Sequence, residues 1–172
     1  MRLIPPLLLA AVLAMPAVSA EGNQWWRVLT QEVERLYREG DHEAAAAVAS
    51  KALEEVEAEQ GANHPDVATC LNNLALVRSA QGEFEAAEPL YRRSVQILEK
   101  SLGPRHPDLA TGLHNLGSLQ KALRRFDEAD ALYRRALQIR ERALGGNDPL
   151  TQATRAALLE LRNRPGSHAA GR

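Results

Sequence analysis

Apolar residues recur at helical spacing along most of this chain, in segments separated by short breaks that contain glycine or proline. In the segment 83–101, for example, an apolar stripe that includes Phe84, Ala87 and Leu98 lies opposite charged positions, which is the pattern of an amphipathic helix. Aromatic and β-branched residues are scarce, which also favours helices over strands. We therefore predict an all-α chain with helices at about 24–38, 41–59, 65–80, 83–101, 107–122, 126–143 and 149–162.

The helical pattern is repeated with a fixed period. Residues 61–102 align with 103–144 without a gap, and about 20 of the 42 aligned positions are identical. A fixed period of this length predicts an array of stacked units, here at about 24–60, 66–102 and 108–144, followed by a half-unit with a final helix at 149–162. A continuous coiled coil is excluded because glycine and proline interrupt the pattern about every 20 residues.

The second unit contains the stretch HPDVATCLNNLALVRSAQGEFEAAEPLYRRSVQILEKSLG. This stretch resembles the tetratricopeptide repeat, in the longer form found in kinesin light chains, and the resemblance extends over about residues 26–162. It implies a right-handed α-solenoid of three helix pairs closed by a C-terminal capping helix. It also implies a non-enzymatic scaffold for protein–protein interaction. The first unit departs from the pattern, because Glu32 and Val33 stand where the second has Leu74 and Ala75.

The two ends of the chain differ from the repeats. Residues 1–20 place Arg2 before an apolar run and end in small residues, as in a secretory signal peptide. We expect cleavage after Ala20, a repeat domain at 21–162, and a disordered tail at 163–172. These features predict export, most simply to a bacterial periplasm or to the medium. No second apolar run is long enough for a bilayer, so we expect no membrane insertion after cleavage.

Composition narrows the classes of function. The formal net charge of the chain is -1, which gives no global attraction to nucleic acid. No motif for a serine nucleophile, a zinc hydrolase or a phosphate-binding loop is present, so we expect neither an enzyme nor a cofactor. The single cysteine, Cys70, aligns with Val28 and Gly112, which predicts a buried thiol. Paired arginines at 92–93 and 134–135 are expected on a solvated outer face with ion pairs inside each helix.

The tripeptide His-Pro-Asp begins the first helix of units two and three, at His64 and His106. Histidine and aspartate could form a metal site or a proton relay. In the third copy, however, Asp148 replaces the histidine and Leu150 replaces the aspartate, while the proline stays. Asp is a good N-cap and Pro suits the first turn, so a capping role explains all three copies. At the other end, Trp26 aligns with alanines, and Trp25-Trp26 either closes the core or anchors a partner.

In the family that this chain resembles, the first helices of the pairs line a concave groove. Asn73 and its counterpart Asn115 carry carboxamides that can donate and accept hydrogen bonds, and the resemblance implies that they hold the backbone of a peptide ligand. Bridging of adjacent repeats by these asparagines is the alternative. Few groove cations are available for a terminal carboxylate. A structural subunit that self-associates through its ends or its convex face remains a second hypothesis. The predicted groove residues are Thr69, Asn72, Asn73, Leu76, Thr111, His114, Asn115 and Ser118.

Overall fold

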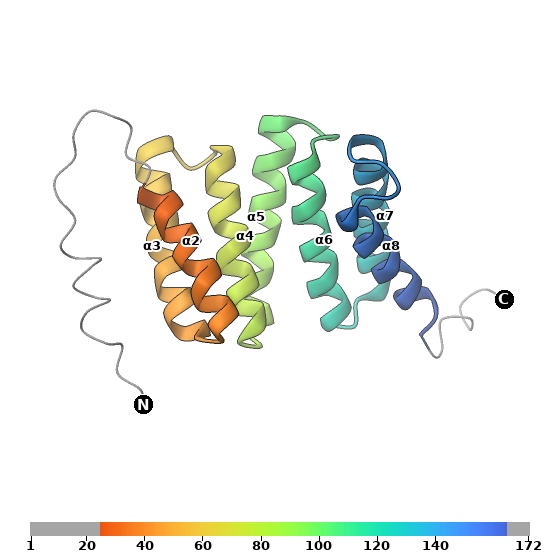
Figure 1. Cartoon of the computed structure of the whole chain (residues 1–172), viewed down its shortest axis with the longest axis horizontal. Coiled ribbons are helices and arrows are strands. Elements are labelled where there is room, and N and C mark those ends of the chain that lie inside the picture. The colour runs from red at the N-terminus through yellow and green to blue at the C-terminus, as the bar shows by residue number, and fades with distance from the viewer. Residues whose placement is uncertain (1–24, 165–172) are drawn as a thin grey trace.

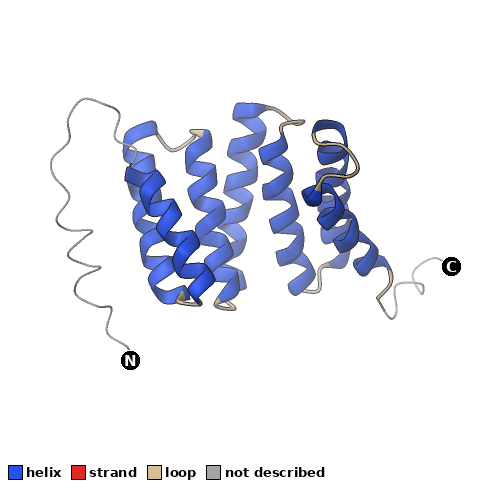
Figure 2. Ribbon diagram, viewed as in Figure 1, coloured by secondary structure: helices blue, strands red, loops and turns tan. Residues whose placement is uncertain are grey.

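The computed structural model describes residues 25–164, so the predicted signal peptide and nearly all of the predicted tail lie outside the described residues. Between these limits the chain forms seven helices and no strand (Figure 2). Each helix lies within one residue of its predicted range, which confirms the all-α prediction. The helices are α2 (Trp25–Glu39), α3 (His42–Gln60), α4 (Pro65–Ala80), α5 (Phe84–Leu102), α6 (Pro107–Ala122), α7 (Phe126–Ala143) and α8 (Pro149–Arg162).

The helices form antiparallel pairs that stack side by side in one row (Figure 1). The pairs are α2 with α3, α4 with α5 and α6 with α7, and each second helix also packs against the first helix of the next pair. Helix α8 packs against α7 at the C-terminal end of the row, where it occupies the place of a fourth first helix. The described part of the chain is therefore an α-helical repeat solenoid.

The His-Pro-Asp segments are helix N-caps. His64 has extended backbone angles, and its Nδ1 accepts the N–H of Asp66 at 3.2 Å. His106 makes the same 3.2 Å contact with the N–H of Asp108, and a proline opens both helices. Asp148 accepts the N–H groups of two residues in the first turn of α8, at 2.9 and 3.3 Å. In all three helices, a side chain just before the first turn bonds to N–H groups that have no partner inside the helix. This shared contact confirms the capping interpretation.

The turn inside each helix pair requires a left-handed backbone. Gly40 and Gly82 both have φ of 80°, a conformation that glycine adopts without a steric cost. The equivalent residue of the third pair is Arg124, whose φ is 61°. The third turn thus keeps the geometry of the other two although its residue has a Cβ atom.

Large aromatic side chains fill the core between the helices of each repeat unit. Tyr91 and Tyr133 are almost fully buried between the helices of units two and three. Of the two tryptophans, Trp26 is 5 % exposed and closes the core of the first unit, whereas Trp25 is only half-buried. Cys70 is also buried, as predicted, and burial raises the pKa of its thiol to about 11. The thiol is therefore protonated and unreactive at neutral pH.

Pro89 lies inside α5, at a position that is Ala47 in α3 and Ala131 in α7. Proline has no N–H to donate to the carbonyl of Glu85 one turn earlier, so it weakens the helix. Replacing Pro89 by Ala is expected to raise the free energy of unfolding by about 1 to 3 kcal/mol, measured by urea denaturation. The opposite change, Ala131→Pro, should destabilise α7. A Pro89→Ala variant no more stable than the parent chain would contradict this account.

Candidate functional site

The eight predicted groove residues come from the first helices of units two and three. Helices α2, α4 and α6 follow one another across one side of the stack (Figure 1), and α4 contacts both of the others. We name the surface that these three helices present the first-helix face. The predicted residues share this face, but they differ in how many of their polar groups are already used inside the molecule.

Asn115 connects two repeats. Its Nδ2 donates a hydrogen bond to Oδ1 of Asn72 at 3.0 Å, which joins α6 to α4. Both side chains are half-buried. This contact is the bridge between adjacent repeats that the sequence left open as an alternative. The carboxamide of Asn115 is thus engaged in holding the array together.

Asn73 differs from Asn115, although the two occupy equivalent positions. It is half-buried, and its side chain makes no hydrogen bond among residues 25–164. Its side chain lines a cavity of about 190 Å³ between α2 and α4. The cavity places an available carboxamide beside a largely apolar hollow on the first-helix face. Its other lining residues are Val33, Glu34, Tyr37, Arg38, Leu76 and Val77.

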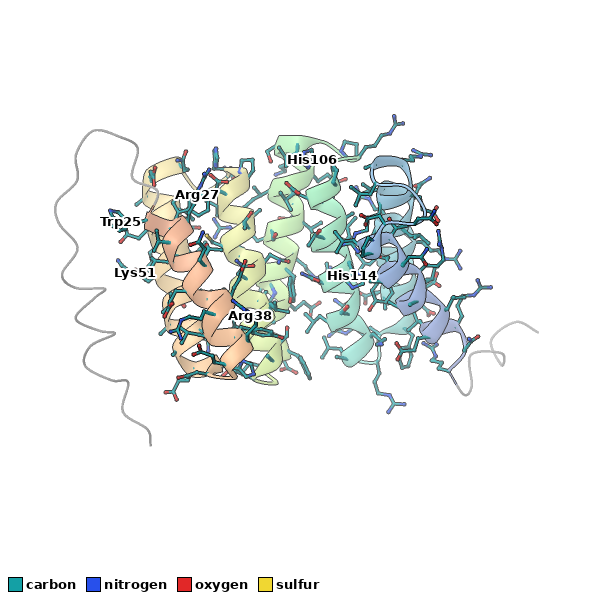
Figure 3. All side chains as sticks on the ribbon, in the orientation of Figure 1. Trp25, Arg27, Arg38, Lys51, His106 and His114 are labelled. Atoms are coloured by element: carbon teal, nitrogen blue, oxygen red, sulfur yellow. The ribbon has the colours of Figure 1, made fainter. Side chains whose placement is uncertain are left out.

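The residues that α2 contributes to this cavity were not among those predicted from the sequence. Arg38, labelled in Figure 3, lies in the last turn of α2, where its Nε donates to the carbonyl of Glu34 at 3.3 Å. Glu34 and Arg38 stand 42 residues before Leu76 and Ala80, so the register of the repeat contained the signal. The departure of the first unit from the repeat pattern obscured it.

His114 points toward α8 from the third first helix (Figure 3). Its ring centroid lies 5.3 Å from that of Tyr133, and its Nδ1 lies 3.2 Å from Oγ1 of Thr154. Burial lowers the pKa of His114 to about 4, and the positive charges of Arg140 and Lys121 act in the same direction. The ring is therefore neutral at physiological pH, and it packs inside a helix contact.

The remaining predicted residues of unit three are also engaged in internal contacts. Ser118 donates to the carbonyl of His114 at 3.1 Å and accepts from the hydroxyl of Tyr133 at 3.0 Å. Thr111 accepts from Nη2 of Arg140 at 3.3 Å. Thr111 is exposed, but its hydroxyl is engaged by Arg140; Thr69 of unit two is exposed without such a contact in the described residues, and Leu76 is 36 % exposed. The predicted groove residues whose polar groups are not already used inside the molecule therefore lie on unit two, beside the cavity that α2 helps to form.

A buried arginine in α7 is the second feature that sequence reasoning missed. Arg140 is only 3 % exposed, and the equivalent positions of the first two units are Val56 and Leu98. Its Nη1 donates to Oγ1 of Thr154 and, at 2.9 Å, to the carbonyl of Leu150. It forms no ion pair with any carboxylate in the described part of the chain, and its Nε has no partner there. Burial lowers the pKa of this guanidinium, which nevertheless stays protonated.

The paired arginines of the outer helices form two kinds of ion pair. Arg92 and Arg134 bind carboxylates one turn earlier in their own helices, as predicted. Arg93 and Arg135 instead reach Glu57 and Glu99, respectively, in the preceding second helix. The prediction of ion pairs within each helix was therefore wrong for these two, because neighbouring second helices lie close enough for a long side chain to cross.

The described residues hold neither a metal-ligand cluster nor a membrane-spanning helix. In residues 25–164, no three side chains of His, Cys, Asp or Glu are grouped so as to hold a metal ion. None of the helices described has both the length and the apolar character needed to cross a membrane.

Comparison with known families assigns most of the chain to one repeat type. Residues 35–100, 71–142 and 108–170 each match the family model described as Tetratricopeptide repeat. These overlapping matches cover well over half of the sequence. A comparison with curated proteins finds no match.

Solved structures share the fold at low sequence identity. BtubC (BKLC) from P. vanneervenii matches with a TM-score of 0.77 and 24% identity, over 90% of this chain and 62% of that one. The nearly identical TPR-like repeats of a protein assigned as a kinesin light chain in Podosopora anserina match with a TM-score of 0.74 and 21% identity, over 79% and 64%. The chain thus spans less than two thirds of either structure. The first TPR of Spaghetti (RPAP3) has a TM-score of 0.59 and 16% identity, over 83% and 95%.

Proposed function

Because the chain belongs to the tetratricopeptide repeat family, we propose that it is a non-enzymatic scaffold whose first-helix face binds an extended segment of a partner protein. The observation that carries this proposal is the position of Asn73, whose carboxamide has no hydrogen-bond partner in the described structure and borders a cavity of about 190 Å³. The family assignment supports a protein as the ligand, and the cavity supports the first-helix face beside Asn73 as the place where it binds.

The cavity supplies two kinds of contact that an extended peptide needs. The carboxamide of Asn73 can donate to a backbone carbonyl and accept from a backbone N–H, whatever side chains the peptide carries. Tyr37, Leu76 and Val77 form the apolar part of the hollow, which has room for an apolar side chain of the ligand. Glu34 and Arg38 flank it with charges of opposite sign, which favours a segment of mixed charge.

A structural neighbour supports a peptide as the class of ligand. The first TPR of Spaghetti is bound to the HSP90 peptide SRMEEVD. In the present chain, however, two of the three cations that the first helices place near the groove, Arg27, Arg38 and Lys121, are already engaged. Arg27 lies over the ring of Trp26, 5.1 Å from its centroid, and Nζ of Lys121 lies 3.0 Å from a carboxylate oxygen of Glu160. We therefore propose that the ligand is an internal segment and not a chain terminus held by its carboxylate.

The burial of Trp26 favours this proposal over self-association through that ring. A ring that is 5 % exposed cannot serve as an anchor for a second copy without leaving the core. Self-association through the convex face, or through an end such as the half-buried Trp25, is the remaining alternative. The proposal that the scaffold acts in the periplasm or outside the cell rests on residues 1–20, which have the layout of a signal peptide.

Peptides selected from a random linear library on residues 21–172 provide a direct test of the groove. Asn73→Ala combined with Leu76→Asp is expected to weaken their binding at least tenfold in fluorescence polarisation, because it removes the carboxamide and charges the hollow. Asn115→Ala is the matched control and should change affinity less than threefold, because its amide bonds to Asn72. Circular dichroism checks that both variants remain helical. Equal binding by the Asn73/Leu76 variant and the parent chain would refute the groove.

A further inference from the structure

A second cavity lies at the edge of the stack where α5 ends and α6 begins. This edge also carries the C-terminal end of α7 (Figure 1). The cavity has a volume of about 590 Å³, which lies within the range of small-molecule sites. It is formed by the loop between α5 and α6 and by the last turns of α7. Its lining residues are Pro104, Arg105, Arg135, Gln138, Ile139, Arg142 and Ala143.

The lining carries positive charge without a matching acid. Arg135 is bound to Glu99 of α5, so its charge is compensated. Arg105 and Arg142 are exposed and form no ion pair with any carboxylate among residues 25–164. No aspartate or glutamate lines the cavity. Two uncompensated guanidinium groups therefore face one hollow.

The repeat shows that Arg105 is not required by the turn. The equivalent residue is Asn63 at the preceding junction and Asn147 at the following one. Asparagine is a common turn residue because its side chain bonds to nearby backbone groups, whereas arginine offers no such advantage. The arginine is thus a departure from the repeat, and it occurs at the junction that has the cavity.

The equivalent loop between α3 and α4 shows how this edge of the stack is organised when the loop carries no arginine. There Arg93 pairs with Glu57 and donates to the carbonyl of Ala62 at 3.0 Å, so its guanidinium spans the distance from helix to loop. At the later junction Arg135 keeps the equivalent ion pair with Glu99. No bond from Arg135 to the loop is formed among the described residues, and the loop instead presents Arg105.

We propose that this cavity binds a small polyanion, a ligand that carries phosphate groups or several carboxylates. The planar fork of arginine matches both groups with paired hydrogen bonds, and Gln138 adds an uncharged donor. Pro104, Ile139 and Ala143 provide apolar surface for the rest of the ligand. The site lies on α7 and the α5–α6 loop, so it is separate from the first-helix face and does not depend on the function proposed above.

Titration calorimetry of residues 21–172 at low ionic strength tests the proposal, with pyrophosphate and citrate as the probes. Arg105→Asn, which restores the residue of the other junctions, and Arg142→Ser are each expected to weaken binding of the preferred probe at least tenfold. Arg124→Asn is the matched control. It removes the same charge from the opposite edge of the stack, and asparagine tolerates the φ of 61° at that position. This control should bind within twofold of the parent chain.

The outcomes separate the site from general electrostatic attraction. A stronger response to pyrophosphate identifies phosphate as the ligand group, and a stronger response to citrate identifies carboxylates. Absence of binding by the parent chain at millimolar concentrations of either probe would overturn the proposal, as would equal losses in Arg124→Asn. The affinity of the Arg105→Asn and Arg142→Ser variants for the selected peptides, measured in parallel, should remain unchanged. The two sites thus have separate readouts, and a failure of the anion proposal does not count against the peptide groove.

Discussion

Replacing Arg140 by alanine is expected to lower the free energy of unfolding by about 3 kcal/mol. The side chain is 3 % exposed, so truncation leaves a cavity between α6, α7 and α8. It also removes the donors that reach Thr111, Thr154 and the carbonyl of Leu150. Urea denaturation measures the loss of stability. Amide hydrogen exchange should show the largest loss of protection in α8, because that helix contacts the row mainly through α7.

Arg140→Leu separates the volume of this residue from its charge. Leucine is the residue of the second repeat at this position, Leu98, and it refills most of the cavity without a charge to desolvate. Replacing a buried charge by a packed apolar side chain is often neutral or stabilising, so we expect a stability within about 1 kcal/mol of the parent chain. Arg134→Ala, on the exposed side of α7, should change stability by no more than about 0.5 kcal/mol. If Arg140→Ala is as mild as Arg134→Ala, the guanidinium does not hold α8.

Local features of the fold could be predicted because they depend on residues close in sequence. The N-caps are an example, since His64, His106 and Asp148 each bond to N–H groups in the next turn. Comparing three copies was decisive, because capping suits all three, whereas a metal or catalytic role would lose one of its residues where Leu150 replaces the aspartate. The burial of Cys70 was predicted from the apolar or small residues at equivalent positions, of which Gly112 is buried whereas Val28 is exposed.

The site was less predictable because it depends on contacts between repeats. The period correctly placed Asn73 and Asn115 on one face, but it gave them the same role. Their surroundings differ, because Asn115 meets Asn72 of the preceding repeat whereas Asn73 meets the cavity against Val33 and Tyr37. A periodic sequence fixes which face a side chain occupies. Its partner depends on the neighbouring unit, and the first unit is the one that diverges most from the repeat.

The end of the array shows the same limit. The alignment of Arg140 with Leu98 already marked a charge at an apolar position. The hydrogen-bond partners of this guanidinium could not be predicted, because they belong to α8. Thr154 of α8 stands where α6 has Gly112 and α4 has Cys70, and its hydroxyl accepts a hydrogen bond from Arg140. Helix α8 thus closes the row with polar partners for Arg140 and His114.

Acidification from pH 7 to 5 is expected to destabilise the fold through His114. The folded pKa of this histidine is about 4, below its ordinary value of 6.5, because burial and the nearby charges of Arg140 and Lys121 disfavour the protonated ring. Between these pH values the unfolded chain binds a proton that the folded chain does not. The contribution of His114 is therefore complete above about pH 6.5 and is lost as the pH falls toward 4. The full loss is about 1 to 3 kcal/mol, the lower figure allowing for solvent at the half-buried ring.

His114→Asn isolates this contribution, because asparagine is the residue of the second repeat at the same position, Asn72. Urea denaturation at steps between pH 7 and 5 should give a shallower loss of stability for the variant than for the parent chain. His64 and His106 cap their helices in both proteins, so their contributions cancel in the difference. Glu88 is held by Gln120, Arg92 and Arg125, which lower its pKa to about 2, so its loss begins only below about pH 4.5 in both. Parallel curves between pH 6.5 and 5 would show that the imidazole at the α6–α8 contact takes up its proton as readily in the folded chain as in the unfolded one.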